Sequence, residues 1–137
     1  MDWRIQAIRG ATTVANNVAE EIAAATHELL DTLEMKNRLS PEHIISVTFS
    51  VTRDLDALFP AAAARQRPGW DAVPLLDVQH MHVEGSLPHC IRVLIHTQVP
   101  VLHEEVCHIY LRDAQKLRPD LGSPAISMPA SVQSMND

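Results

Sequence analysis

The stretch NVAEEIAAATHELLDTLEMK, residues 17–36, decides the fold. Its apolar side chains recur every three or four positions, at Val18, Ile22, Ala25, Leu29 and Leu33. This interval places them on one face of an α-helix. Asn17 and Glu20 have the spacing of a capping box, so we expect the helix to start at Asn17 and to run to about Lys36. Such a helix is amphipathic and packs one face on a sheet.

The segments on either side of this helix have the alternating or apolar patterns of strands. They span residues 3–8, 45–51, 73–78, 90–97 and 106–111. Residues 9–13 are expected to form a polar exit from the first strand, and a short helix is expected from Ala61 to Gln66, after Pro60. This order predicts an α/β or α+β fold, a mixed sheet with helices on one face. The other face would be uncovered in a single chain, and self-association is a natural way to cover it.

The chain has 137 residues, of which 46% are apolar, and this suits one domain with one core. We expect that domain to span residues 1–121. The segment that follows is rich in Gly, Ser, Pro, Met and Asn, with few large apolar side chains. This composition predicts a flexible C-terminal tail at residues 122–137.

The net charge of -6 argues against a nucleic-acid or anionic-membrane surface, because both need a basic patch. A small anion can still bind where several arginines converge. No apolar run approaches the roughly 20 residues that span a bilayer, and the first residues lack the apolar segment of a signal peptide. We therefore expect a cytoplasmic protein in which Cys90 and Cys107 are buried, reduced thiols.

Arg92 is the most informative single residue, because it lies in the apolar strand CIRVLI, residues 90–95. A charge that is buried there needs an anion. That anion is either a protein carboxylate or a ligand, unless the side chain extends out to solvent at an interface. Arg9, Arg65 and Arg118 taken singly are typical of solvated surface residues. If several of them converge with Arg92, they form a site for a dicarboxylate, since guanidinium binds carboxylate in a bidentate manner.

The sequence gives no support to other common chemistries. His80 and His82 have the spacing that would put two rings on one strand face, but no third ligand is placed near them and no HExxH or CxxC motif occurs. The glycine patterns of dinucleotide and nucleotide phosphate sites and the nucleophile elbow of hydrolases are also missing. We expect neither a metal nor a cofactor.

Short blocks along the chain resemble the AroH-type chorismate mutases in order and spacing, without a gap from about residue 3 to residue 121. The blocks are IRGATTV (8–14), DL (54–55), FPA (59–61), AR (64–65), GW (69–70), VP (73–74), CIRV (90–93), HIYL (108–111) and LRPDL (117–121). The resemblance implies a homotrimer, a pseudo-α/β-barrel with three active sites at subunit interfaces. It also implies an isomerase that rearranges chorismate to prephenate in aromatic amino acid biosynthesis, without cofactor or metal.

The implied reaction is unimolecular and needs no nucleophile. The enzyme must hold the folded substrate and stabilise the charge that separates as the ether bond breaks. By resemblance, Arg92 is the catalytic cation near the ether oxygen, Arg9 grips the enolpyruvyl carboxylate and Tyr110 lies beside it. The remaining substrate contacts implied are apolar at Phe59, Leu76 and Leu117 and cationic at Arg65 and Arg118.

The chain departs from the family at three positions. His80 stands where the family has a glutamate that accepts a hydrogen bond from the ring hydroxyl and supplies negative charge. Asp77 stands where the family has a cysteine, and Ala62 where it has a lysine that attracts the substrate. We hypothesise that Asp77 faces the same substrate region as position 80 and supplies the missing carboxylate.

Two other functions fit the same residues. The first is an AroH-like enzyme in which His80 acts as a general base and favours elimination from chorismate or a related enolpyruvyl ether. The second is a trimer that binds a dicarboxylate without catalysis. The retention of Arg9, Arg92 and Tyr110 argues against the second, and the identity of the product separates the first from a mutase.

Overall fold

The structure is a computed structural model that describes residues 2–102 and 105–121. Its strands are β1 (Trp3–Thr13), β2 (Ile44–Val51), β3 (Leu75–Gln79), β4 (Cys90–Pro100) and β5 (Ile109–Tyr110). Its helices are α1 (Ala19–Asn37), α2 (Pro60–Arg65) and three short 3-10 turns at Pro41–His43, Arg112–Lys116 and Pro119–Leu121. The flexible tail predicted at residues 122–137 lies outside the described residues.

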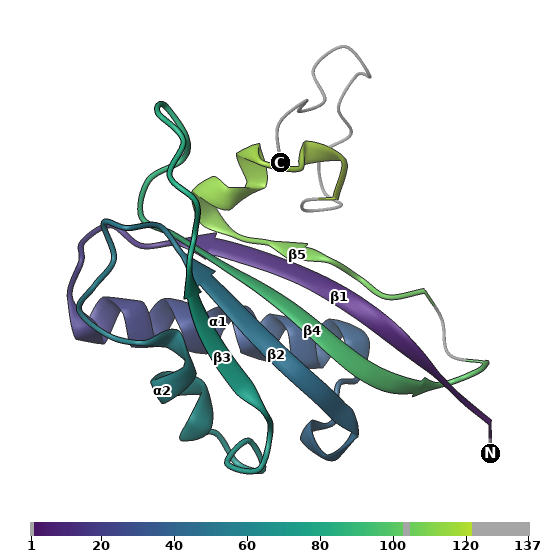
Figure 1. The fold of residues 1–137 in the computed structure, drawn as a ribbon. Coiled ribbons are helices and arrows are strands. Elements are labelled where there is room, and N and C mark those ends of the chain that lie inside the picture. Colours follow the sequence, from purple (N-terminus) through teal and green to yellow (C-terminus); the bar gives the residue numbers. More distant parts are fainter. Residues whose placement is uncertain (1, 103–104, 122–137) are drawn as a thin grey trace.

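The five strands form one mixed sheet in the order β3-β2-β4-β1-β5. The central strand β4 pairs antiparallel with β1 and with β2, whereas β3 and β5 pair parallel with their neighbours at the two edges. Both α-helices lie on the same side of this sheet (Figure 1). The predicted fold class, a mixed sheet with helices on one face, is confirmed. No helix in the described part of the chain is long and apolar enough to cross a membrane.

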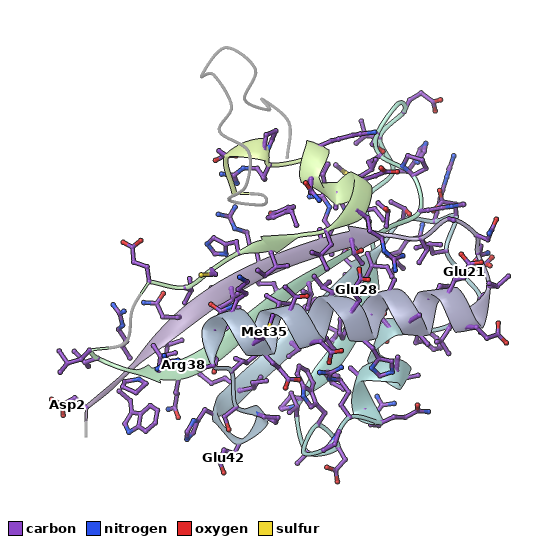
Figure 2. All side chains as sticks on the ribbon, turned by 180° about the vertical axis from the view of Figure 1, so that it is seen from behind. Asp2, Glu21, Glu28, Met35, Arg38 and Glu42 are labelled. Atoms are coloured by element: carbon purple, nitrogen blue, oxygen red, sulfur yellow. The ribbon has the colours of Figure 1, made fainter. Side chains whose placement is uncertain are left out.

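The core fills the space between α1 and the sheet. Figure 2 views the molecule from behind and shows α1 lying across that side of the sheet. Ile22, Leu29 and Leu33 of the helix are fully buried, as the periodicity predicts. Gly10 allows the close approach of the helix, because a Cβ atom there would lie 3.1 Å from Leu33 Cδ1 and 3.2 Å from Leu29 Cδ1. Packing against the helix therefore determines which face of β1 is buried. The other face of the strand is not covered by α1.

The opposite face of the sheet carries no α-helix within residues 2–102 and 105–121 (Figure 1). Alternate residues of the strands point to it, so that Leu76 and Leu94 are 57% and 38% exposed. Arg92 lies between buried Ile91 and Val93 in the sequence and therefore also points to this face. We call it the open face of the sheet.

Three local predictions are wrong. Residues 9–13 are not a polar exit, because they continue β1 and pair with residues 90–94 of β4. The cap of α1 is Val18 without a side-chain hydrogen bond, since the Asn17 side chain instead bonds Asp56 and the backbone N–H of Ala57. Cys90 is buried as expected, whereas Cys107 is exposed because β5 begins only after it.

Asn37 at the end of α1 holds the segment that leads into β5. Its Nδ2 donates to the Cys107 carbonyl at 2.9 Å, and its Oδ1 accepts from the Cys107 N–H at 2.7 Å. Asn37 is only 4% exposed, so both bonds form in a place with little access to water. The Asn37 side chain thus makes the hydrogen bonds that the backbone of Cys107 would make to a neighbouring strand if β5 were longer.

We expect Asn37→Ala to lower the free energy of unfolding by about 1–3 kcal/mol, because both backbone groups of Cys107 lose their partner. Urea denaturation followed by circular dichroism measures the change. Met35→Ala is the control, since Met35 lies on the same helix and is 71% exposed, so its effect stays within about 0.5 kcal/mol. Equal effects of the two substitutions would contradict this role of Asn37.

Candidate active site

A pocket of about 440 Å³ opens on the open face of the sheet, and four of the predicted site residues line it. They are Arg9 on β1, Arg92 on β4, Tyr110 on β5 and Arg118 between the last two 3-10 turns. We call this the cationic pocket. A chain of net charge -6 thus brings three guanidinium groups to one place. Such a site suits a small ligand with more than one carboxylate.

The strand register sets the position of Arg92. It pairs with Ala11 on β1 and with Ser50 on β2, so the half-buried side chain rises from the middle of the sheet. Its sequence neighbours Ile91 and Val93 are fixed in the core on the other side. The burial of Ile91 and Val93 therefore determines the direction of the Arg92 side chain, which is held on a strand and not on a loop.

Tyr110 reaches the pocket from the short edge strand. It pairs parallel with Ala11 and is 5% exposed, packed with Ala11 and Ala114. Leu117, predicted as part of the apolar wall, packs against the same small cluster. This packing places Tyr110 in the lining of the pocket together with Arg9 and Arg92.

Arg118 binds a carboxylate group of the protein itself. Its Nε and Nη2 donate to the two oxygens of Asp120 at 3.1 and 2.9 Å. These hydrogen bonds lower the pKa of Asp120, and the charges of Arg118 and Arg9 lower it further. A protein carboxylate thus already makes the bidentate contact that a ligand carboxylate would make.

His80 belongs to the same side of the sheet. Its Nδ1 lies 3.2 Å from Oγ of Ser50, a residue that lines the cationic pocket, and its backbone N–H donates to the Val51 carbonyl at 2.7 Å. Leu76 also lies on the open face, where it pairs with the pocket residue Thr48. His82 contacts Glu84 instead, at 3.4 Å. Within residues 2–102 and 105–121, no group of three or more His, Cys, Asp or Glu side chains is placed to hold a metal ion.

Two other predicted residues, Phe59 and Asp77, line a separate pocket of about 460 Å³ between the loop that leads from β2 into α2 and the edge strand β3. Phe59 is 69% exposed at the start of α2. The Ala61 N–H donates to Asp77 Oδ1 at 3.0 Å. Burial raises the pKa of Asp77, although this hydrogen bond and the charge of Arg65 partly oppose the rise. We call this the edge pocket.

Within one chain, positions 77 and 80 lie on opposite sides of the sheet. Asp77 pairs with Phe49, whose ring is fully buried on the helix side of the sheet. His80 contacts Ser50, which points to the open face. The predicted site residues therefore divide into two groups on opposite sides of the sheet. Arg9, Arg92, Tyr110, Arg118, Leu117, Leu76 and His80 form one group, and Phe59, Asp77 and Arg65 form the other.

Sequence reasoning missed Ser50 and Asp120. The alternation of residues 45–51 already puts Ser50 on the polar face of its strand, which is the signal that would have identified it. Asp120 stands two residues after Arg118 in the block LRPDL, in which the resemblance implies a role only for Leu117 and Arg118. Short-range pairing of this kind depends on the turn at Pro119, which the sequence pattern does not reveal.

Comparison with known proteins agrees with this geometry. The sequence pattern of the family Chorismate mutase type I matches residues 5–121. Chorismate mutase AroH of Bacillus subtilis (strain 168) is 43% identical over 117 residues, which make up 85% of this chain and 92% of that protein. Chorismate mutase AroH of Thermus thermophilus is 47% identical over 120 residues, which make up 87% of this chain and 98% of that protein.

A solved structure gives the same result for the fold. The chorismate mutase from Clostridium thermocellum superposes with a TM-score of 0.74 at 46% sequence identity, covering 80% of this chain and 97% of that one. Because the family pattern spans most of the residues and two relatives are 43% and 47% identical, the chain belongs to the type I, or AroH, family of chorismate mutases.

Proposed function

We propose that the chain is a cytoplasmic homotrimer that rearranges chorismate to prephenate in aromatic amino acid biosynthesis. The observation that carries the proposal is the convergence of Arg9, Arg92, Arg118 and Tyr110 on one pocket. Chorismate is a dicarboxylate, and the cationic pocket offers the fixed positive groups that such a ligand needs. Membership of the type I family supports the same reaction.

The roles of the pocket residues follow from the charge that separates in the transition state. As the ether bond breaks, negative charge builds on the enolpyruvyl oxygen and positive charge spreads over the ring. Arg92, rising from the middle of the sheet, is the cation that stabilises this oxygen, and Arg9 and Tyr110 hold the enolpyruvyl carboxylate beside it. Because these groups are already oriented by the strands, they need little reorganisation in the transition state. No proton has to move, so no acid or base is required.

The division of the site residues supports a shared active site. The cationic pocket lies on the open face, whereas Phe59, Asp77 and Arg65 lie by the edge strand β3. An open face of one copy that receives the β3 edge of another makes a head-to-tail contact, and such contacts form a ring when the rotation between copies closes. A ring of three copies brings each edge pocket to a neighbour's cationic pocket. The exposed Leu76 and Leu94 are covered in the same contact.

In this assembly the carboxylate lost at position 80 is restored from a second copy. Asp77 of one chain then faces the substrate ring that is held beside His80 of its neighbour. Its anionic form places negative charge near the developing ring cation. Because burial raises the pKa of Asp77, this charge is lost at a higher pH than for an ordinary aspartate.

A second function is favoured by one observation, the position of His80. Its ring contacts Ser50 at the cationic pocket and stands where the family has a carboxylate. An imidazole there can take a proton from the substrate ring and direct the reaction towards elimination.

Turnover of chorismate by the purified protein, with the product separated by chromatography, tests the proposal. We expect prephenate, and we expect Arg92→Met to reduce kcat by about 10²- to 10³-fold, as for loss of one oriented charged donor. Lys36→Met, an exposed cation on the helix side, is the matched control and retains full activity. A product of elimination in place of prephenate would establish the second function.

The charge hypothesis predicts unequal effects at positions 77 and 80. We expect Asp77→Asn to reduce kcat/KM by about 10²-fold or more, corresponding to about 2.7–4 kcal/mol of transition-state stabilisation. His80→Gln is expected to have a much smaller effect, because neither side chain supplies the negative charge. In the unaltered protein, activity should fall as the pH decreases through the raised pKa of Asp77, above its ordinary 3.8. Equal small losses for the two variants would refute the hypothesis.

A further inference from the structure

His108 immediately precedes the edge strand β5 and lies next to Arg9. The backbone N–H of Arg9 donates to Nδ1 of His108 at 3.0 Å. On the same edge of β1, the Leu111 N–H donates to the Ala11 carbonyl at 2.9 Å. The imidazole therefore takes the place of a backbone carbonyl where the short pairing of β1 with β5 ends.

This hydrogen bond fixes the protonation state of the ring. A ring nitrogen that accepts from a backbone amide carries no proton, so the imidazole is neutral and its proton is on Nε2. Burial lowers the pKa of His108, and the charges of Arg9 on β1 and Arg118 lower it further. Arg118 is itself paired with Asp120. The surroundings thus keep the ring in the form that the hydrogen bond needs.

We propose that His108 is a positioning residue of the cationic pocket, which fixes the backbone of Arg9 and thereby the direction in which the Arg9 guanidinium enters the pocket. This inference rests on the proposed function, in which Arg9 holds the carboxylate of the substrate. Tyr110 follows two residues after His108, so one segment sets the position of both groups. The Asn37 side chain holds the preceding residue, Cys107, and thus anchors this segment to α1.

Protonation of His108 has a predictable consequence. The cationic ring can no longer accept from the Arg9 N–H, and it adds a positive charge beside Arg9 and Arg118. Because the pKa of His108 is below the ordinary value of 6.5, this change sets in only at more acidic pH. At neutral pH the pocket is intact.

Nuclear magnetic resonance of the unliganded protein tests the positioning directly, and it does not depend on any activity. We expect the His108 ring and the Arg9 amide to titrate together below pH 6.5. In His108→Asn the side-chain oxygen can accept in place of Nδ1, so the Arg9 amide stays protected from exchange and does not titrate. In His108→Ala the Arg9 amide should exchange about tenfold faster or more, since it has lost its acceptor.

Kinetics with chorismate then separates positioning from a general structural role. We expect His108→Ala to raise KM about 10- to 100-fold with a smaller change in kcat, because Arg9 binds substrate and transition state alike. His108→Asn should restore KM to within about threefold, since its oxygen replaces the lost acceptor. His43→Ala, at the far end of the sheet beside Trp3, is the control and leaves both constants unchanged.

Two results would overturn the inference: a His108→Asn protein as impaired as His108→Ala, or an Arg9 amide that is unaffected in both. If the unaltered protein fails to turn over chorismate, the proposed function fails. The resonance data still decide whether His108 positions Arg9.

Discussion

Placing guanidinium groups on an apolar sheet costs free energy unless an anion binds them. The arrangement of the whole site depends on this constraint. Arg92 stands between two core residues of the central strand, and Arg9 and Arg118 join it at one pocket. A carboxylate, that of Asp120, already contacts Arg118. The rest of the fold keeps these cations on one face and leaves room there for a further anion.

The helix α1 makes this arrangement possible. By burying Ile8, Phe49 and Ile91 on one side of the sheet, it forces the alternate side chains of β1, β2 and β4 to the other side. The same helix ends at Asn37, which anchors the segment that carries His108 and Tyr110. Packing on the covered face therefore determines the geometry of the site on the open face. A substitution in the core would move the arginines even though it touches no ligand.

Much of this was predictable from the sequence. The periodicity of residues 18–33 predicts α1, and the alternating segments predict all five strands, because burial on one face dictates both patterns. The same alternation predicts that Arg92 and Leu94 share a face. The convergence of Arg9, Arg92, Arg118 and Tyr110 was expected from family resemblance, and the structure brings them to one pocket.

Other features depend on contacts between distant residues, which no local pattern encodes. Asn17 bonds the loop at Asp56 instead of capping the helix, and β1 extends through Thr13 because β4 is long enough to pair with it. Asp77 is near His80 in sequence but lies across the sheet from it, because alternation on β3 turns it towards α2. That separation supports the proposal of an active site shared between copies.

Complementation between two variants of strongly reduced activity tests the shared site most directly. Arg92→Met alters the cationic pocket, and Asp77→Asn alters the edge pocket. If each site combines one pocket from each of two chains, unfolding and refolding the variants together should form mixed trimers in which some sites are wholly native. Under the proposed ring of three, random mixing of equal amounts should restore about a quarter of the unaltered activity, because each site would need one chain of each variant in the right order. A mixture no more active than the separate variants would contradict the shared site.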